Sequence, residues 1–104
     1  MDFQPLAENE ELRTALRRAL AVVEISLERR AQLEHALESR VAIEQAKGML
    51  AERHRLDLAE AFEVIRRASR SKGLKAHAVA RMILDEPETP ELVLEALRRH
   101  LARP

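Results

Sequence analysis

Residues 37–50 read LESRVAIEQAKGML and place Gly48, one of only two glycines in the chain, inside a run of strong helix formers. An interior glycine costs a helix about 1 kcal/mol relative to alanine, so its position there needs a reason. Two reasons stay open: a ligand contacts the backbone at Gly48, or another helix packs closely against it. Arg40, Gln45 and Lys47 lie within two turns of this glycine and favour an interaction surface.

The segment belongs to a long predicted helix, about residues 7–53, that no proline interrupts. At about 100° per residue, an apolar stripe runs along this helix. We expect it to pair with a second copy of the chain in a coiled-coil-like homodimer, because water would otherwise cover the stripe. The predicted dimerisation residues are Leu12, Leu16, Leu20, Val23, Leu27, Leu37 and Val41. Arg30 and Glu34 interrupt the stripe: either they fix the register of an antiparallel pair, or the two helices separate there.

A second stripe predicts that the same helix also packs on the helices that follow it. It consists of Ala36, Ile43, Ala46 and Leu50. Asp57-Leu58-Ala59-Glu60 is a capping-box pattern that starts a second helix, and Gly73 ends that helix at about Lys72. The residues expected to face its core are Ala61, Phe62, Ile65 and Ala68.

A third helix is predicted at about residues 75–84, burying some of Ala76, Val79, Ala80 and Ile83. Thr89-Pro90 predicts the start of a short fourth helix, with Thr89 as N-cap and Pro90 as the first helical residue. The apolar residues of this last helix are Leu92, Val93, Leu94, Leu97 and Leu101. It either covers the bundle or joins the dimer interface. The predicted fold class is all-α.

Composition excludes several function classes. The chain has no cysteine, so it has neither disulfides nor a thiolate metal site. No apolar run approaches the ~20 residues that span a bilayer, and residues 1–5 lack a signal-peptide pattern; we therefore expect a soluble, cytoplasmic protein without membrane contacts.

Phe3 and Phe62 are the only aromatic residues, which disfavours stacking of several bases. The four histidines form no catalytic or metal-binding pattern, so no catalytic residue, metal, cofactor or small-molecule substrate is expected.

The charge is unevenly distributed, although the net charge is zero. Between Val64 and Leu84 there are six basic residues and no acidic one. A basic segment of this kind is typical of proteins that bind a polyanion. The alternative is a solvated helix face that lacks acidic residues.

The motifs together resemble the ANTAR domain (AmiR and NasR transcription antitermination regulator), a bacterial RNA-binding module. The resemblance covers residues 31–84 and rests on Leu37, Ser39, Arg40, Ile43, Gln45, Ala46, Lys47 and Gly48, then Ala61-Phe62, Ile65-Arg66, Ser69, Lys75 and Val79-Ala80. Two positions depart from the family pattern. Gly73 replaces the usual Asn, which also tolerates a left-handed conformation, and Ala76 replaces the usual Leu.

The resemblance implies a three-helix bundle, with a long first helix, that dimerises and binds paired small stem-loops in nascent mRNA, which prevents a terminator from forming. The predicted RNA-binding residues are Arg40, Gln45, Lys47, Gly48, Arg66, Ser69, Arg70 and Lys75. The basic side chains suit phosphates or a guanine edge, and Gln45 and Ser69 suit unpaired loop bases. Alternatively, Arg66 pairs with Glu63, and Ser69 only bonds a carbonyl of its own helix.

We expect three parts: residues 1–30 for dimerisation, residues 31–84 as the RNA-binding domain, and residues 85–104 as a capping helix. About 30 residues precede the resemblance, too few for the sensor domains that family members often carry. We therefore expect a stand-alone form, with its input signal coming from a separate sensor or signalling protein, from dimerisation or from expression level.

Three other functions compete with this interpretation. A protein-interaction module would use the long helix alone, and a helix-turn-helix-like DNA-binding regulator would use the basic segment. A small chorismate mutase-like enzyme would have the same all-helical dimer, but this chain lacks a set of site residues that matches such an enzyme.

Overall fold

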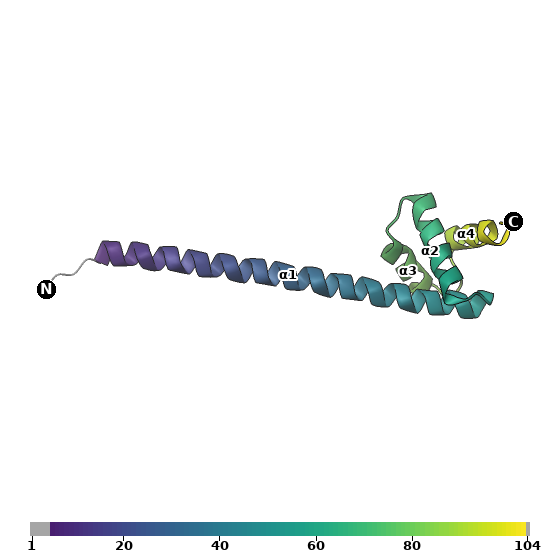
Figure 1. Ribbon diagram of the computed structural model, residues 1–104, viewed down its shortest axis with the longest axis horizontal. Coiled ribbons are helices and arrows are strands. Elements are labelled where there is room, and N and C mark those ends of the chain that lie inside the picture. The colour runs from purple at the N-terminus through teal and green to yellow at the C-terminus, as the bar shows by residue number, and fades with distance from the viewer. Residues whose placement is uncertain (1–4, 104) are drawn as a thin grey trace. The chain divides into compact units, whose positions relative to one another are not determined.

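The computed structural model describes residues 5–103, with side chains from Glu8 onward. These residues form four helices and no strand: α1 (Pro5–His54), α2 (Leu58–Lys72), α3 (Ala76–Asp85) and α4 (Glu91–Leu101) (Figure 1). The all-α prediction is confirmed, including the long first helix and the additional C-terminal helix. The described residues do not include residues 1–4, among them Phe3, or residue 104. These positions are the outer ends of the first and last predicted parts.

The chain divides into two units, with the boundary between Ala36 and Leu37. The described part of the first unit is a single stretch of α1, and its apolar side chains are open to solvent. Leu12, Leu16, Leu20, Val23 and Leu27 are between 51% and 67% exposed, and Val22 and Ile25 are exposed as well. Arg30 Nε lies 3.2 Å from Glu34 Oε1 one turn later, so these two side chains pair within the helix.

The second unit is a helical bundle around one buried apolar cluster. In Figure 1, α3 and α4 lie beside α2, and α3 also lies next to the later part of α1. The buried residues of this cluster are Ala42, Ala46 and Leu50 of α1; Ala61, Val64, Ile65 and Ala68 of α2; Val79, Ala80 and Ile83 of α3; and Val93, Ala96 and Leu97 of α4. The helices are therefore held together mainly by small and branched side chains.

Several predicted core positions were wrong or missing. Ala36 is exposed, because it precedes the unit in which α1 meets the later helices. Ala42 takes its place, one turn before Ala46. Phe62 is only half-buried, whereas Val64 is fully buried and was not predicted. Leu101 is 64% exposed at the end of α4.

The start and end of α2 follow the prediction. Asp57 Oδ1 accepts a hydrogen bond of 2.7 Å from the Glu60 amide, and the Asp57 amide donates to Glu60 Oε1 at 3.3 Å. These two bonds complete the capping box, which satisfies two amides that no helical carbonyl reaches. Gly73 ends α2 with φ of 65°, a left-handed conformation that glycine adopts without steric cost.

The predicted N-cap of α4 was wrong. Pro90, not Thr89, is the N-cap: its carbonyl accepts hydrogen bonds of 3.0 Å from the amides of Val93 and Leu94. The Thr89 hydroxyl instead makes a hydrogen bond of 2.9 Å with His54 Nε2 at the end of α1. Thr89 therefore ties the α3–α4 connection to α1 rather than capping a helix.

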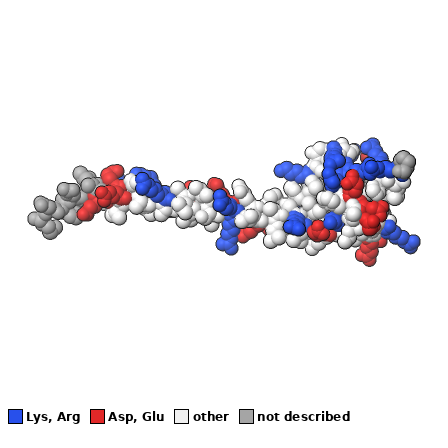
Figure 2. Space-filling model, viewed as in Figure 1, with Lys and Arg blue, Asp and Glu red and all other residues white. Residues whose placement is uncertain are grey.

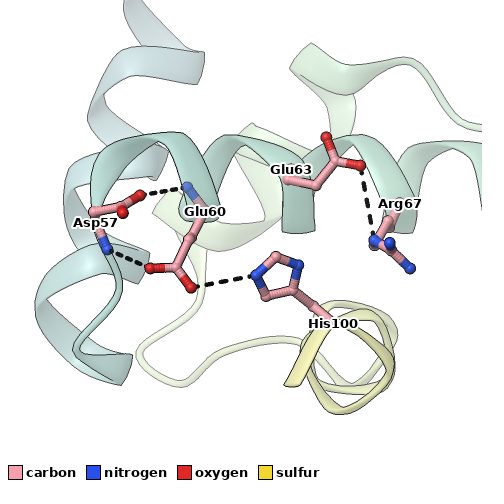
Figure 3. A network of polar contacts seen from close by, with 5 residues as sticks. All are labelled: Asp57, Glu60, Glu63, Arg67 and His100. Atoms are coloured by element: carbon pink, nitrogen blue, oxygen red, sulfur yellow. Dashed lines mark hydrogen bonds and ion pairs between the residues drawn. The ribbon is translucent and has the colours of Figure 1, made fainter. Parts of the chain in front are cut away.

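The last helix covers the bundle by packing on α2. Beyond its buried apolar side chains, His100 Nε2 lies 3.4 Å from Glu60 Oε2 (Figure 3). The same Glu60 closes the capping box through its other oxygen. One carboxylate thus joins the start of α2 to the end of α4, a contact between residues 40 positions apart in the sequence.

Candidate nucleic-acid interface

The centre of the candidate interface is a half-buried phenylalanine that two cations cover. Lys47 Nζ of α1 lies 5.2 Å from the centre of the Phe62 ring, and Arg66 Cζ lies 5.8 Å from it. Phe62 and Arg66 are one turn apart on α2, so they share a face of that helix. A cation over an aromatic ring contributes about 0.5–1 kcal/mol at an exposed site. We call Lys47, Phe62 and Arg66 the cation–aromatic cluster; it joins α1 to α2.

Acidic neighbours on the same helices partly neutralise the cluster. Lys47 Nζ lies 3.2 Å from Glu44 Oε1, and the Lys47 side chain is only 17% exposed. Arg66 Nη1 lies 3.7 Å from Glu63 Oε2, while the other oxygen of Glu63 lies 3.7 Å from Arg67 Nε. The Arg66–Glu63 pair predicted as an alternative is therefore present. Surface pairs such as that of Arg66 with Glu63 contribute about 0–1 kcal/mol, so a phosphate can compete with the Glu63 carboxylate for Arg66.

Ser69 fixes the corner between α2 and α3. Its hydroxyl donates a hydrogen bond to the Leu74 carbonyl, and its own carbonyl accepts one of 3.0 Å from the Leu74 amide. The alternative that Ser69 only bonds a carbonyl of its own helix was wrong, because Leu74 lies beyond the end of α2. The next residue, Lys75, is the exposed N-cap of α3. Ser69 thus holds the segment that carries Lys75.

Gly48 lies on the exposed surface of α1. A Cβ built on it would meet nothing within 4 Å. Close packing against the chain's own described helices therefore does not explain this glycine. Its backbone remains open to an external partner.

Gln45 lies away from the cation–aromatic cluster. Residues two apart on an α-helix project about 160° apart, so Gln45 and Lys47 occupy different sides of α1. Gln45 lines an open groove of about 410 Å³ together with Val41 of α1 and Arg81 of α3, among others. The structure brings together Lys47 and Arg66 but leaves Gln45 on a separate surface.

Several basic side chains in the second unit have no acidic partner among the side chains that the structure describes. Across residues 8–103, no ion pair involves Arg40, Arg70, Lys75 or Arg81, all of which are exposed. On the face seen in Figure 2, Lys and Arg gather over the end of α2 and over α4. Cations outside an ion pair keep their charge available to an anionic partner, so these four residues can attract a polyanion.

Within residues 5–103, no three acidic or histidine side chains are placed to hold a metal ion. None of the helices there has an apolar stretch long enough to cross a bilayer.

A family model described as ANTAR domain matches residues 31–84. The match contains all eight predicted RNA-binding residues and ends near the end of α3, so α4 lies outside it. No curated protein and no solved structure matches the chain.

Proposed function

The chain belongs to the ANTAR domain family, and from that membership we propose that it regulates transcription antitermination by binding RNA. ANTAR domains are known as RNA-binding antitermination modules, a regulatory and not a catalytic class. The proposed ligand is a pair of small stem-loops in a nascent bacterial mRNA in the cytoplasm. Holding the stem-loops prevents the terminator hairpin from forming.

The observation that carries the proposal is the position of the cation–aromatic cluster beside cations that have no acidic partner among residues 8–103. Lys47 and Arg66 come from two helices and meet at Phe62. Arg70 follows Arg66 one turn later on α2, and Lys75 lies at the corner that Ser69 holds. Cations on three successive elements suit the phosphates of a folded RNA better than a single small anion.

The predicted residues take different parts in this proposal. Arg40, Lys47, Arg66, Arg70 and Lys75 neutralise phosphates, and the arginines can also bond a guanine edge. The open backbone at Gly48 allows a close approach of the RNA. Gln45 contacts the RNA from the groove side of α1. The Ser69 hydroxyl already donates its hydrogen to the Leu74 carbonyl, so it can only accept a hydrogen bond from a nucleobase.

Dimerisation would give one molecule two such surfaces, one for each stem-loop. The exposed stripe from Leu12 to Leu27 supports this part of the proposal, because each residue leaves at least half of its side chain in water without a partner copy. Leu37 and Val41, which are 64% and 47% exposed, extend the dimerisation set into the second unit. Residues 1–30 would then serve dimerisation, residues 31–84 RNA binding and residues 85–104 capping, with a separate sensor or signalling protein as the source of input.

The test is a gel-shift titration at several salt concentrations. It compares an RNA with two adjacent small stem-loops, the same RNA with scrambled loops, and a DNA duplex of equal length. The proposal predicts tight binding to the first RNA only, with affinity falling as salt rises because counterions are released. Equal, salt-sensitive binding to all three would leave a general polyanion binder. Binding to duplex DNA alone would favour the helix-turn-helix alternative, and no binding at all would favour the protein-interaction module.

A further inference from the structure

A second basic site lies between α2 and α4, apart from the cation–aromatic cluster. It is a cleft of about 190 Å³, lined by Arg67, Arg70 and Ser71 of α2 and by Glu95, Ala96 and Arg99 of α4. The α4 residues lie beyond the segment that matches the ANTAR domain. The cleft is therefore a feature that this chain's last helix adds to the domain.

The charges around the cleft favour an anion. Three of the six lining side chains are arginines, and the ion pairs of residues 8–103 include neither Arg70 nor Arg99. The one acidic lining residue, Glu95, has Lys72 Nζ 3.7 Å from its Oε2, which offsets its charge. An arginine fork matches the oxygens of a phosphate, which makes arginine the preferred residue for phosphate recognition.

Arg67 carries a donor that the protein leaves without a hydrogen bond. Its Nε is buried, and the nearest carboxylate oxygen, on Glu63, is 3.7 Å away, beyond hydrogen-bond distance. A buried donor without an acceptor costs about 1–3 kcal/mol. Because this Nε is buried, an anion in the cleft would be bonded by the other guanidinium nitrogens of Arg67, whose side chain is 27% exposed.

The volume of the cleft limits the size of the ligand that it can enclose. Sites that enclose a whole small molecule usually measure about 300–1,000 Å³, whereas a water molecule takes about 30 Å³. A volume of about 190 Å³ lies below that range, so the cleft accommodates a small group such as a phosphate rather than a whole drug-sized molecule. The remaining part of such a ligand must lie outside the cleft, as it does in a polynucleotide.

The cleft also continues the proposed RNA-binding surface. Going round α2, Arg70 lies about 40° from Arg66, and Arg67 lies about 60° beyond Arg70. Arg66 belongs to the cation–aromatic cluster, and the other two arginines line the cleft. Since Arg70 itself lines the cleft, a backbone that passes over Arg66 and Arg70 would lead into it.

We propose that the cleft between α2 and α4 binds a backbone phosphate of the RNA, through Arg67, Arg70 and Arg99. The inference rests on the proposed RNA-binding function. It assigns α4 a role beyond covering the core: α4 adds a contact that is independent of the base sequence.

The test compares two α4 variants that each lose one positive charge. Arg99→Gln removes a cleft arginine, whereas Arg98→Gln removes a neighbouring arginine that pairs with Glu91 at 3.0 Å and does not line the cleft. Arg99→Gln should weaken binding of both the intact and the scrambled-loop RNA about tenfold and lower the salt slope by about 1. Arg98→Gln should leave both nearly unchanged. Conversely, Glu95→Gln should tighten binding a few-fold, and Glu91→Gln should not.

The outcomes separate this inference from the proposed function. If Arg99→Gln and Arg98→Gln bind RNA equally well, the cleft proposal is wrong, while RNA binding itself stands. If the unmodified protein binds no RNA, the proposed function fails. A titration with inorganic phosphate, followed by NMR of the arginine side chains, then tests whether the cleft binds an anion. In that case, shifts of the Arg67 and Arg99 Nε signals on addition of phosphate would show that the cleft binds free phosphate rather than an RNA backbone. Absence of shifts would overturn the site altogether.

Discussion

The Lys47 ammonium lies 5.2 Å from the centre of the Phe62 ring and 3.2 Å from a carboxylate oxygen of Glu44. One side chain thus contacts α2 through the ring while pairing with an acid one turn away on α1. Its aliphatic part is largely covered, since only 17% of the side chain is exposed. Truncating Lys47 would remove packing and charge together, so a test of its role in RNA binding must separate the two.

Replacing Lys47 with methionine makes that separation. Methionine fills a similar volume and packs well against an aromatic ring, but it carries no charge. Lys47→Met should weaken RNA binding about tenfold and leave the thermal unfolding midpoint within a few degrees, as followed by circular dichroism. Lys47→Arg serves as the control that keeps the charge. If Lys47→Met binds RNA as tightly as the unmodified protein, Lys47 only joins α1 to α2.

The corner that carries Lys75 leads to a second prediction. Ser69→Ala removes the hydrogen bond to the Leu74 carbonyl and should lower the free energy of unfolding by about 0.5–1.5 kcal/mol. The looser corner should also weaken RNA binding, because Lys75 is less well positioned. Urea unfolding and RNA titration measure the two effects, and Ser69→Thr, which keeps a hydroxyl, should restore most of both. Unchanged stability in Ser69→Ala would show that the bond does not hold the corner.

Local signals in the sequence were sufficient for the ends of α2. Asp57, Glu60 and Gly73 act within a few residues of their own position, so their types alone specify the cap and the left-handed turn. The helical period also identified most of the core. It misplaced Ala36 because periodicity does not tell where along a long helix a bundle begins.

Contacts between distant segments could not be predicted. Threonine is a common N-cap residue, but the Thr89 hydroxyl makes its hydrogen bond with His54, 35 positions earlier in the sequence. The site shows the same limit: Lys47 and Arg66 were both expected to bind RNA, yet their meeting at Phe62 depends on how α1 packs on α2. The arginine cleft needs α4 beside α2, and no single segment of the sequence contains that arrangement.

Gly48 provides a prediction in which stability and function change in opposite directions. Since a Cβ at this position meets nothing within 4 Å, Gly48→Ala should raise the free energy of unfolding by about 1 kcal/mol through helix propensity. RNA binding should weaken nevertheless, because the methyl group occupies the surface that the RNA approaches. Thermal unfolding and RNA titration of the same variant provide both values. A more stable protein with unchanged RNA affinity would mean that this glycine serves no RNA contact.

The dimerisation proposal can be tested with two matched substitutions on α1. Leu20 and Ile25 are similarly exposed, at 51% and 57%, but they lie about 140° apart around the helix. Leu20→Asp places a charge in the predicted stripe and should convert the dimer to a monomer of 11.9 kDa in analytical ultracentrifugation. Ile25→Asp makes the same kind of change outside the stripe and should leave the dimer intact. If Ile25→Asp dissociates the dimer and Leu20→Asp does not, the interface lies on the other face of α1. If the unmodified protein already sediments as a monomer of 11.9 kDa, the dimerisation proposal is wrong.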